Sequence, residues 1–258
     1  MTEGVPDFNS TKSPVVEEYT ICQDSFVWYY LRIMKRKANP QGYNVVVFDC
    51  DSTLSAVEGI DLLAEKYGVK KEVEKITHHA MNGHSNFADA LAFRLQLVRP
   101  CKSDMKWLGG QYIEREVPGT KELVTKLKKL RKKVFIISGG FDSAIKIFAS
   151  HIGVKKSNVL CNSLLFDKSG KYRGFDNSNP LSKNHGKKIV LKQITKLGST
   201  VFVGDGVTDL EAKNVVDLFV GFGGVKVREV VKRESDIFID DNTLLRMKDI
   251  AIGKNIAF

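Results

Sequence analysis

The chain has 258 residues, 43% of them hydrophobic and 27% charged, and its formal net charge is +10. This composition is ordinary for a soluble globular protein, and the length suffices for one large domain or for a domain with an insertion. The four cysteines (Cys22, Cys50, Cys101 and Cys161) are far apart and form no C-x-x-C pair. Their spacing argues against a disulfide framework and against a zinc site, and it fits a reducing compartment.

The net positive charge would suit an anionic substrate or a polyanionic partner. Most of the lysines and arginines, however, recur on predicted helices such as Lys121–Lys133, which we interpret as solvated helix faces. No RNA- or DNA-binding signature is present, no apolar run reaches membrane-spanning length, and the polar N-terminus resembles neither a signal peptide nor a transit peptide. We therefore expect a cytoplasmic protein without a nucleic-acid or membrane partner.

Residues 1–43 are predicted to be an N-terminal extension. Met1–Pro14 is polar, whereas Ser25–Lys37 is aromatic on one side and basic at its end, as in a short amphipathic helix. Such a helix could bind a membrane or a partner, but we favour packing on the core of its own chain. The turn Asn39–Gly42 separates it from the first strand.

The stretch Val45–Thr53 begins with an unbroken apolar run, which is typical of a strand buried on both faces. The next sixty residues have helical periodicity and predict four helices, with Ser103 as the N-cap of the last: Glu58–Tyr67, Lys70–Met81, Phe87–Val98 and Ser103–Tyr112. We interpret residues 58–113 as a helical cap domain inserted after the first strand.

From Pro118 onward, strands alternate with helices, which indicates a parallel sheet with helices on both sides. The predicted helices are Lys121–Arg131, Asp142–His151, Lys187–Leu197, Thr208–Val215, Val225–Lys232 and Leu244–Ile252. The predicted strands are Lys133–Ser138, Thr200–Val203, Leu218–Val220 and Ile237–Ile239, with a hairpin formed by Asn158–Phe166 and Lys171–Phe175. The expected fold is therefore α/β: a doubly wound parallel sheet made of residues 44–57 and 114–258, with an inserted four-helix cap.

Two carboxylates, Asp49 and Asp51, directly follow the first predicted strand. Acids placed this close at the end of a buried strand repel each other, and a cation between them would make the arrangement tolerable. In open α/β sheets this edge is also where ligands bind. The alternative is that Asp51 or Ser52 caps the next helix.

Two other predicted strands end in motifs that suit an anion and a metal. Ser138-Gly139-Gly140 offers a hydroxyl and closely approachable backbone N–H groups, and Gly204–Asp209 places Asp205 and Asp209 at another strand end. Each motif alone would also fit an ordinary turn or a helix start.

Lys187 lies on the apolar face of its predicted helix with Val190 and Ile194, so it needs an anionic partner. A snorkelling lysine is the alternative, and Lys183 and Lys188 are rivals for the role.

Together these residues suit phosphoryl transfer. Asp49 is placed to attack phosphorus and form an aspartyl-phosphate, and Asp51 to protonate the leaving oxygen and then activate water. Asp49, Asp205 and the backbone carbonyl of Asp51 could complete the octahedral oxygen shell of Mg²⁺. Ser138, the Gly139 N–H and Lys187 would neutralise the equatorial phosphoryl oxygens.

The order D-x-D-x-T, S-G-G, lysine, G-D-G-x-x-D resembles the haloacid dehalogenase superfamily of phosphohydrolases. From about Val45 onward the chain is similar to the phosphoserine phosphatases of that superfamily. The similar stretches are D-C-D-S-T-L, E-G-I-D-L-L-A (58–64), R-L-Q-L at Arg94, I-S-G-G-F (137–141), G-D-G-V-T-D-L-E-A (204–212) and F-V-G-F-G-G (219–224). S-G-G and G-D-G occur across the superfamily, whereas E-G-I-D and Arg94 are more specific to the phosphoserine phosphatases.

The resemblance implies Mg²⁺-dependent hydrolysis of O-phospho-L-serine to L-serine and phosphate, the last step of serine synthesis in this family. It implies that Glu58 meets the substrate ammonium and Arg94 its carboxylate, which fits their chemistry. Met81 and Phe87 fall where the family lines the pocket with apolar groups, and Thr208 where it contacts substrate. The alternative for Glu58 is an acid in the first turn of a helix, and the alternative for Arg94 is a snorkelling arginine. For Met81, Phe87 and Thr208 the alternative is core packing.

Two departures from the family pattern are Asn82 in place of a glycine and His185–Lys188 in place of a glycine-rich segment before the lysine. Alternative functions are a related phosphatase or phosphotransferase for another small phosphomonoester such as phosphohomoserine, or a non-catalytic polyanion-binding protein. The sequence is compatible with a homodimer, but it leaves the oligomeric state open.

Overall fold

A computed structural model of the chain describes residues 39–81 and 86–254, without the side chains of residues 78–81. The described residues belong to one compact unit, Ala38–Phe258. The predicted polar segment Met1–Pro14 and the predicted amphipathic helix Ser25–Lys37 lie outside the described residues.

The core of the unit is a six-stranded parallel sheet with the order β3-β2-β1-β6-β7-β8. Its strands are β1 (Val45–Phe48), β2 (Lys133–Phe141), β3 (Val159–Asn162), β6 (Thr200–Gly204), β7 (Leu218–Phe222) and β8 (Ile237–Ile239). β1 lies in the middle, where Val47 pairs with Phe135 of β2 and Phe202 of β6. The predicted doubly wound sheet is confirmed.

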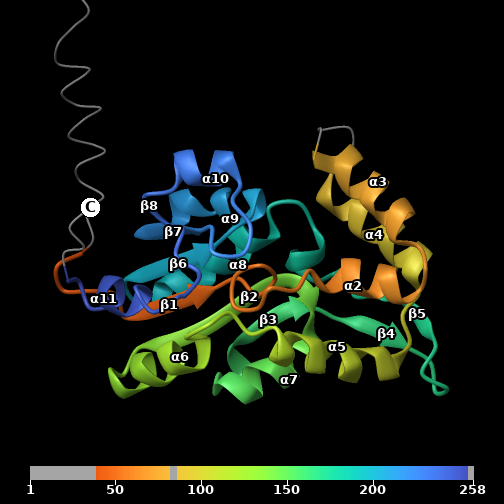
Figure 1. The fold of residues 1–258 in the computed structure, drawn as a ribbon, viewed down its shortest axis with the longest axis horizontal. Coiled ribbons are helices and arrows are strands. Elements are labelled where there is room, and N and C mark those ends of the chain that lie inside the picture. The colour runs from red at the N-terminus through yellow and green to blue at the C-terminus, as the bar shows by residue number, and fades with distance from the viewer. Residues whose placement is uncertain (1–38, 82–85, 255–258) are drawn as a thin grey trace, which may run out of the picture. The chain divides into compact units, whose positions relative to one another are not determined.

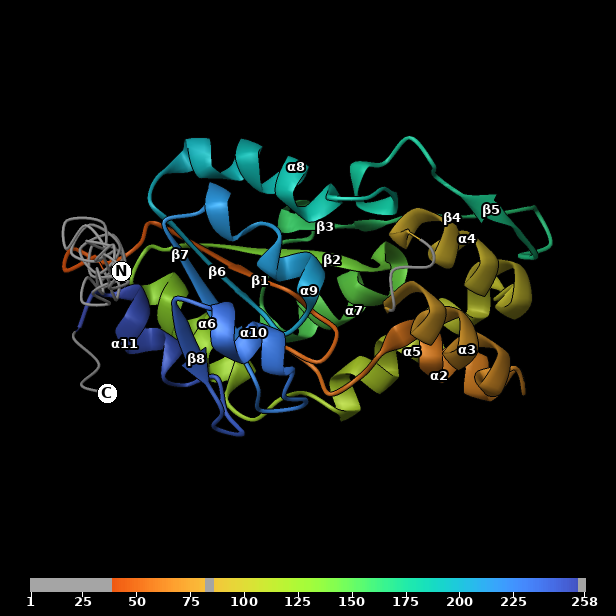
Figure 2. The ribbon, with the colours of Figure 1, turned by 90° about the horizontal axis from the view of Figure 1, so that it is seen from above.

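Helices cover both faces of the sheet (Figures 1 and 2). One face carries α6 (Thr120–Lys129), α7 (Asp142–Ile152) and α11 (Met247–Ala251), and the other carries α8 (Gly186–Ile194), α9 (Val207–Leu210) and α10 (Glu229–Glu234). Alternate side chains of β1 enter the two cores, Val46 and Phe48 on the first face and Val45 and Val47 on the second. All four are fully buried, which explains the unbroken apolar run.

Four helices lie between β1 and α6 in the chain: α2 (Gly59–Lys66), α3 (Lys70–Met81), α4 (Phe87–Val98) and α5 (Lys102–Glu114). Together with the hairpin β4–β5 (Leu164–Phe166 and Tyr172–Phe175), α2, α3 and α4 lie beyond the end of the sheet at which β1 finishes (Figures 1 and 2). We call α2–α5 the helical insert. The proposed boundaries of a cap domain, 58 and 113, stay a prediction.

The N-cap predicted for α5 was wrong. The helix begins at Lys102 with Cys101 as N-cap, so Ser103 lies inside its first turn. The Asp104 side chain accepts a hydrogen bond from the Cys101 N–H at 2.7 Å, which fixes the earlier start.

Several predicted elements of the core also differ from the structure, among them the final helix, which is Met247–Ala251 where Leu244–Ile252 was predicted. The first half of the predicted hairpin is divided, because residues 159–162 pair with β2 in the main sheet and only residues 164–166 pair with β5. The helix predicted over residues 208–215 is reduced to α9 and a separate turn at Lys213–Val215. α10 begins at Glu229, because Arg228 is extended (φ −113°, ψ 114°) and its side chain is bound to Asp205.

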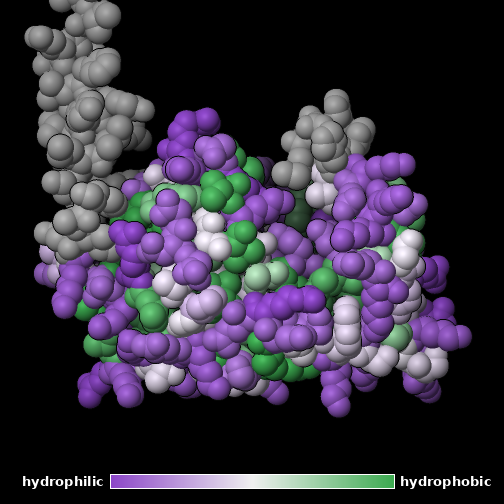
Figure 3. Space-filling model, in the orientation of Figure 1, coloured by the Kyte–Doolittle hydropathy of each residue, from purple (hydrophilic) through white to green (hydrophobic). Residues whose placement is uncertain are grey.

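Of the helices in the described part of the chain, none combines the length and apolar character that a membrane span requires. On the face drawn in Figure 3, hydrophilic side chains predominate and the surface is hollowed between α10 and α3.

Candidate active site

A cavity of about 590 Å³ opens at the end of β1, between the sheet and the helical insert. The strand order reverses at β1, with β2 on one side and β6 on the other, so the loops after these strands diverge and leave a crevice. The predicted site residues that line it are Asp49, Asp51, Glu58, Phe87, Arg94, Ser138, Gly139, Gly140, Lys187, Asp205, Thr208 and Asp209. Met81 is the last residue of α3, and its side chain lies outside what the structure describes.

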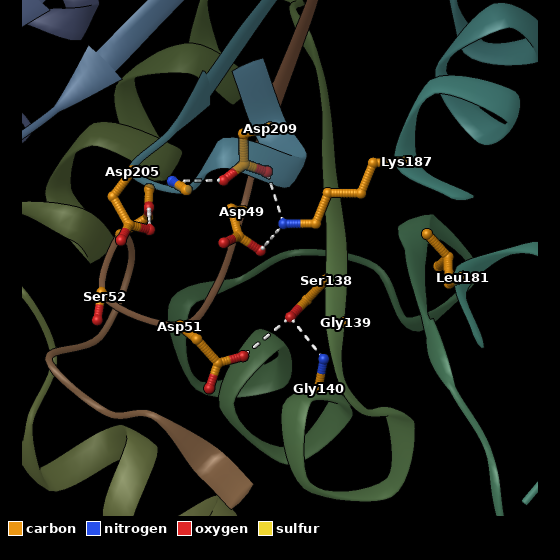
Figure 4. Close-up of polar contacts among 12 residues, drawn as sticks. Asp49, Asp51, Ser52, Ser138, Gly139, Gly140, Leu181, Lys187, Asp205 and Asp209 are labelled. Carbon is orange, nitrogen blue, oxygen red and sulfur yellow. Dashed lines mark hydrogen bonds and ion pairs between the residues drawn. The ribbon is translucent and has the colours of Figure 1, made fainter. Parts of the chain in front are cut away.

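Lys187 bridges two carboxylates in the floor of the cavity (Figure 4). Its Nζ lies 2.9 Å from Asp49 Oδ1 and donates to Asp209 Oδ1 at 2.5 Å. Burial lowers the pKa of Lys187, but the charges of Asp209 and Asp49 outweigh it and raise that pKa above its ordinary value. The lysine therefore remains charged, and its inward position fits the prediction from the apolar face of its helix.

Asp205 follows β6 and is also buried. The Thr53 hydroxyl donates to its Oδ1 at 3.0 Å, and Arg228 forms an ion pair with its Oδ2. Burial and the negative charge of Asp209 raise the pKa of Asp205 to about 7, although Arg228 opposes the shift.

The acids of this floor fit a hard divalent cation. Carboxylate oxygens of Asp49, Asp205 and Asp209 lie within 4.8 Å of one another, and all three residues are buried. Asp49 Oδ1 is paired with Lys187 but accepts no hydrogen bond within the described residues, and burial raises the pKa of Asp49 well above its usual range. Such an all-oxygen cluster is the ligand type that Mg²⁺ prefers. The Asp51 carboxylate is outside the cluster, and the sequence assigned only its backbone carbonyl to the metal.

Asp51 is held by three donors instead. Tyr112 Oη and the Gly59 N–H each donate to its Oδ1 at 2.7 Å, and Ser138 Oγ donates to its Oδ2 at 3.0 Å. Burial, and after it the negative charge of Glu58, raise the pKa of Asp51 to about 6, while the hydrogen bonds partly offset the rise. A carboxyl group with this pKa can give and take a proton near neutral pH.

The S-G-G motif forms the end of β2 beside Asp51 (Figure 4). Ser138 Oγ accepts a hydrogen bond from the Gly140 N–H at 3.0 Å. A Cβ atom at Gly140 would lie 2.8 Å from Asp51 Oδ2, and one at Gly139 would lie 3.3 Å from the Phe87 ring. Glycine therefore allows the backbone to line the cavity without displacing its acid or its apolar wall.

The helical insert contributes two more charged residues to the lining of the cavity. Glu58, the N-cap residue of α2, accepts a hydrogen bond from Ser52 at 2.8 Å. Arg94 on α4 uses Nε to hold the Ala90 carbonyl at 3.1 Å. Burial lowers the pKa of Arg94, opposed chiefly by Asp61, but a guanidinium remains charged at neutral pH.

Two residues whose side chains bind the acids of the site were not found from the sequence. Tyr112 lies on α5, 61 residues after Asp51, and Arg228 lies 23 residues after Asp205. Neither belongs to a motif with a known spacing. The only signal for Arg228 was its place shortly after F-V-G-F-G-G, in a segment that was predicted to be helical.

Comparisons with known proteins agree with this geometry. Residues 43–215 match the family model of haloacid dehalogenase-like hydrolases. The chain is 39% identical to phosphoserine phosphatase of Bos taurus over 201 residues, which cover 77% of this chain and 89% of that protein. It is 41% identical to the chloroplastic phosphoserine phosphatase of Arabidopsis thaliana over 199 residues, covering 75% and 68%.

Solved structures give the same result. A substrate-bound phosphoserine phosphatase complex superposes with a TM-score of 0.67 at 29% identity, covering 79% of this chain and 96% of the other. A phospho-aspartyl intermediate analogue of phosphoserine phosphatase superposes with a TM-score of 0.65, also at 29% identity, covering 80% and 97%. Sequence, fold and site agree, and the chain belongs to the phosphoserine phosphatase family of haloacid dehalogenase-like hydrolases.

Proposed function

We propose that this protein hydrolyses O-phospho-L-serine to L-serine and phosphate through an aspartyl-phosphate. The observation that carries the proposal is the convergence of Asp49, Ser138, Lys187 and Asp205 on one cavity that also holds Glu58 and Arg94. The first four suit the phosphoryl group and the last two suit an amino acid. A site for phosphoryl transfer and a site for an amino acid therefore share one volume.

In the first step the Asp49 carboxylate attacks phosphorus, and the bond between phosphorus and the serine oxygen breaks. Asp51, in its protonated form, gives its proton to the departing serine oxygen. Lys187 carries positive charge next to Asp49 and compensates the negative charge of the transferring group. The Ser138 hydroxyl and the Gly139 N–H are assigned to the equatorial oxygens.

In the second step a water molecule attacks phosphorus and the aspartyl-phosphate bond breaks. Asp51, now a carboxylate, takes the proton of that water, so Asp49 is released as a carboxylate and Asp51 is again protonated. The pKa of about 6 supports both roles. Tyr112 and the Gly59 N–H hold Asp51 through its Oδ1 in both steps.

The residues assigned to Mg²⁺ are Asp49, Asp205 and the backbone carbonyl of Asp51, with the buried Asp209 beside them. When bound, the ion offsets negative charge on the phosphoryl oxygens.

Specificity is assigned to the insert side of the cavity. The Glu58 carboxylate complements the substrate ammonium, and the Arg94 guanidinium matches the carboxylate as a planar fork. Phe87 and Thr208 also line the cavity, and Met81 is assigned to its apolar wall from the family pattern. We propose that the helical insert acts as a cap that encloses the substrate.

The decisive experiment measures phosphate release from a panel of phosphorylated amino acids, phosphohomoserine and small sugars, with Mg²⁺ and with a chelator. We expect O-phospho-L-serine to be the best substrate and the chelator to stop the reaction. Asp49→Asn should abolish turnover while the circular dichroism spectrum stays native. Turnover by Asp49→Asn would show that Asp49 is not the nucleophile. Equal rates across the panel would contradict the proposed specificity for O-phospho-L-serine. Adding acceptor alcohols tests the alternative that the protein is a phosphotransferase. A phosphotransferase would form a phosphorylated alcohol instead of free phosphate.

Cytoplasmic location and a homodimer remain predictions. The three cysteines among the described residues are free thiols, and Cys50 and Cys161 are buried, which supports a reducing compartment. Fractionation of the source cells and the solution mass of the purified protein test the two predictions.

A further inference from the structure

Arg228 contacts two acids of the cavity although it belongs to none of the motifs. Its Nη1 forms an ion pair with Asp205 Oδ2 and also donates to the Asp205 backbone carbonyl at 3.3 Å. Its Nη2 lies 3.4 Å from Glu58 Oε1. One guanidinium thus bridges a candidate metal ligand and the residue assigned to the substrate ammonium.

Both oxygens of Asp205 are already engaged. The Thr53 hydroxyl donates to Oδ1 at 3.0 Å, and Arg228 occupies Oδ2. A divalent cation that uses the cluster of Asp49, Asp205 and Asp209 must therefore share or replace one of these contacts. The two contacts differ in charge, because a hydroxyl is neutral whereas a guanidinium carries a permanent positive charge that a dication would repel.

The two contacts also differ in freedom to move. Thr53 is fully buried in the turn after β1. Arg228 has a long side chain that is 19% exposed, and it comes from the connection between β7 and α10. Displacing Arg228 therefore disturbs less of the core than displacing Thr53. Glu58 offers the guanidinium a second anionic partner in the same cavity.

We propose that Arg228 competes with the divalent cation for Asp205, so that cation binding displaces the guanidinium from Oδ2. The inference rests on the metal site of the proposed function and adds to it a residue that sets metal affinity. Competition makes a definite prediction: removing the charge of Arg228 tightens Mg²⁺ binding. If Arg228 were a supporting partner that orients Asp205 for the metal, its removal would weaken binding.

The test is isothermal titration of chelator-treated protein with Mg²⁺ alone, without substrate. We expect Arg228→Gln to lower the dissociation constant of Mg²⁺ on the order of tenfold, the size of a typical coupling between two sites. Arg228→Lys, which keeps the charge, should stay within a few-fold of the wild type. The matched control is Arg233→Gln on α10, the helix that follows Arg228, since Arg233 is exposed, pairs with Glu234 and does not line the cavity.

A second measurement follows Arg228 in the wild-type protein and does not depend on Arg228→Gln. The Arg228 Nε–H resonance, assigned by its loss in Arg228→Lys, should shift during the Mg²⁺ titration with the midpoint found by calorimetry. Unchanged or weaker Mg²⁺ binding in Arg228→Gln, or equal tightening in Arg233→Gln, would overturn the competition. If Arg228→Gln fails to fold, an Arg228 Nε–H resonance that does not shift on Mg²⁺ binding would overturn the competition instead.

Failure of the metal site itself gives a different result. If the wild type binds no Mg²⁺, or if Asp205→Asn binds it as tightly as the wild type, the proposed metal site is wrong and this inference falls with it. If the wild type binds Mg²⁺ through Asp205 and Arg228→Gln changes nothing, only the competition is refuted.

Discussion

Asp51 owes its proton affinity to opposing influences that can be separated by mutation. Burial and the charge of Glu58 raise its pKa, whereas hydrogen bonds from Tyr112, the Gly59 N–H and Ser138 lower it. These donors stabilise the carboxylate because a hydrogen bond to the charged form is stronger than one to the protonated, neutral form. Tyr112 comes from the insert, so the insert tunes an acid of the sheet.

Tyr112→Phe removes one donor and keeps the ring that stacks on Phe148. Losing a bond that stabilises the charged form should raise the pKa of Asp51 above about 6 by roughly one unit. The limb of the pH–rate profile that belongs to Asp51 should move to higher pH by the same amount. Tyr172→Phe on β5, outside the cavity, is the control. A profile that stays in place in Tyr112→Phe would show that this hydrogen bond does not set the proton affinity.

Arg94→Ala tests the assignment of the substrate carboxylate. Hydrogen bonds to a charged partner contribute about 1.5–3 kcal/mol, so kcat/KM for O-phospho-L-serine should fall by about 10- to 150-fold. Turnover of p-nitrophenyl phosphate, which has no carboxylate, should change much less. Arg173→Ala, an exposed arginine on β5, should affect neither substrate. An equal fall for both substrates would mean that Arg94 does not read the carboxylate.

The acids and the serine that the strand pattern predicted share one property: they lie at the end of a strand or directly after it. Asp49, Ser138 and Asp205 follow or end β1, β2 and β6, and neighbouring parallel strands bring their ends to one edge. A local sequence pattern therefore predicts that side chains far apart in the chain lie close together at this edge. Tyr112 and Arg228 reach the same place from positions that topology alone does not fix. Their side-chain directions depend on how α5 and the segment before α10 pack, which no local pattern encodes.

At the scale of elements, a glycine lies where α5 packs most closely against Ile147 of α7. A Cβ atom at Gly109 would lie 2.9 Å from Ile147 Cβ, whereas one at the adjacent Gly110 would meet nothing within 4 Å. Gly109 faces α7 and Gly110 faces away. Alanine at the two positions therefore gains the same helix propensity, but only at Gly109 does it also change the packing. Tyr112, which donates to Asp51, lies one turn later on α5.

Gly110→Ala should raise the free energy of unfolding by about 0.5–1 kcal/mol, because alanine is the better helix former. Gly109→Ala gains the same propensity but overpacks the contact with Ile147, which costs about 1–3 kcal/mol, so it should be destabilised by about 1 kcal/mol. Urea unfolding of both variants measures the difference. If Gly109→Ala is as stable as Gly110→Ala, α5 and α7 can separate without cost.

Periodic elements were predictable and irregular ones were not. α3, α4 and β8 begin and end at the predicted residues, because a long apolar stripe or a short apolar strand with clear breakers fixes both ends. The wrong N-cap of α5, the divided hairpin and the late start of α10 depend on Asp104, on pairing with β2 and on the ion pair of Arg228. Each of these is a contact of one side chain or one strand edge, and it outweighs the local preference.

At the scale of the whole molecule, the fold gathers negative charge where a stable core would avoid it. Asp49, Asp51 and Asp205 are carried to one edge by the fully buried strands β1 and β6, and their neighbours include Glu58 and Asp209. Lys187, Arg94 and Arg228 compensate only part of this charge. The pKa values of Asp51 and Asp205 are raised to about 6 and about 7, because keeping these buried carboxylates charged remains unfavourable.

This cost makes the stability of the chelated protein depend on pH with a definite sign. Between about pH 4 and 7 the folded state holds protons on Asp51 and Asp205 that the unfolded chain, with an ordinary pKa of 3.8, has lost. The free energy of unfolding should therefore fall as pH rises through this window, by up to about 1.4 kcal/mol per pH unit for each group. The measurement is the difference in unfolding free energy between the wild type and Asp205→Asn from pH 5 to 8 in chelator.

Saturating Mg²⁺ should act in the opposite direction, because a cation binds the deprotonated carboxylates and stabilises the folded state more as pH rises. The increase in Tm on adding Mg²⁺ should thus be larger at pH 8 than at pH 5, and Asp205→Asn should lose most of it. Asp167→Asn, in the turn between β4 and β5 and not among the residues that line the cavity, is the control and should keep the full increase. An increase in Tm that is the same at both pH values, or that survives in Asp205→Asn, would show that the ion binds somewhere other than this acidic cluster.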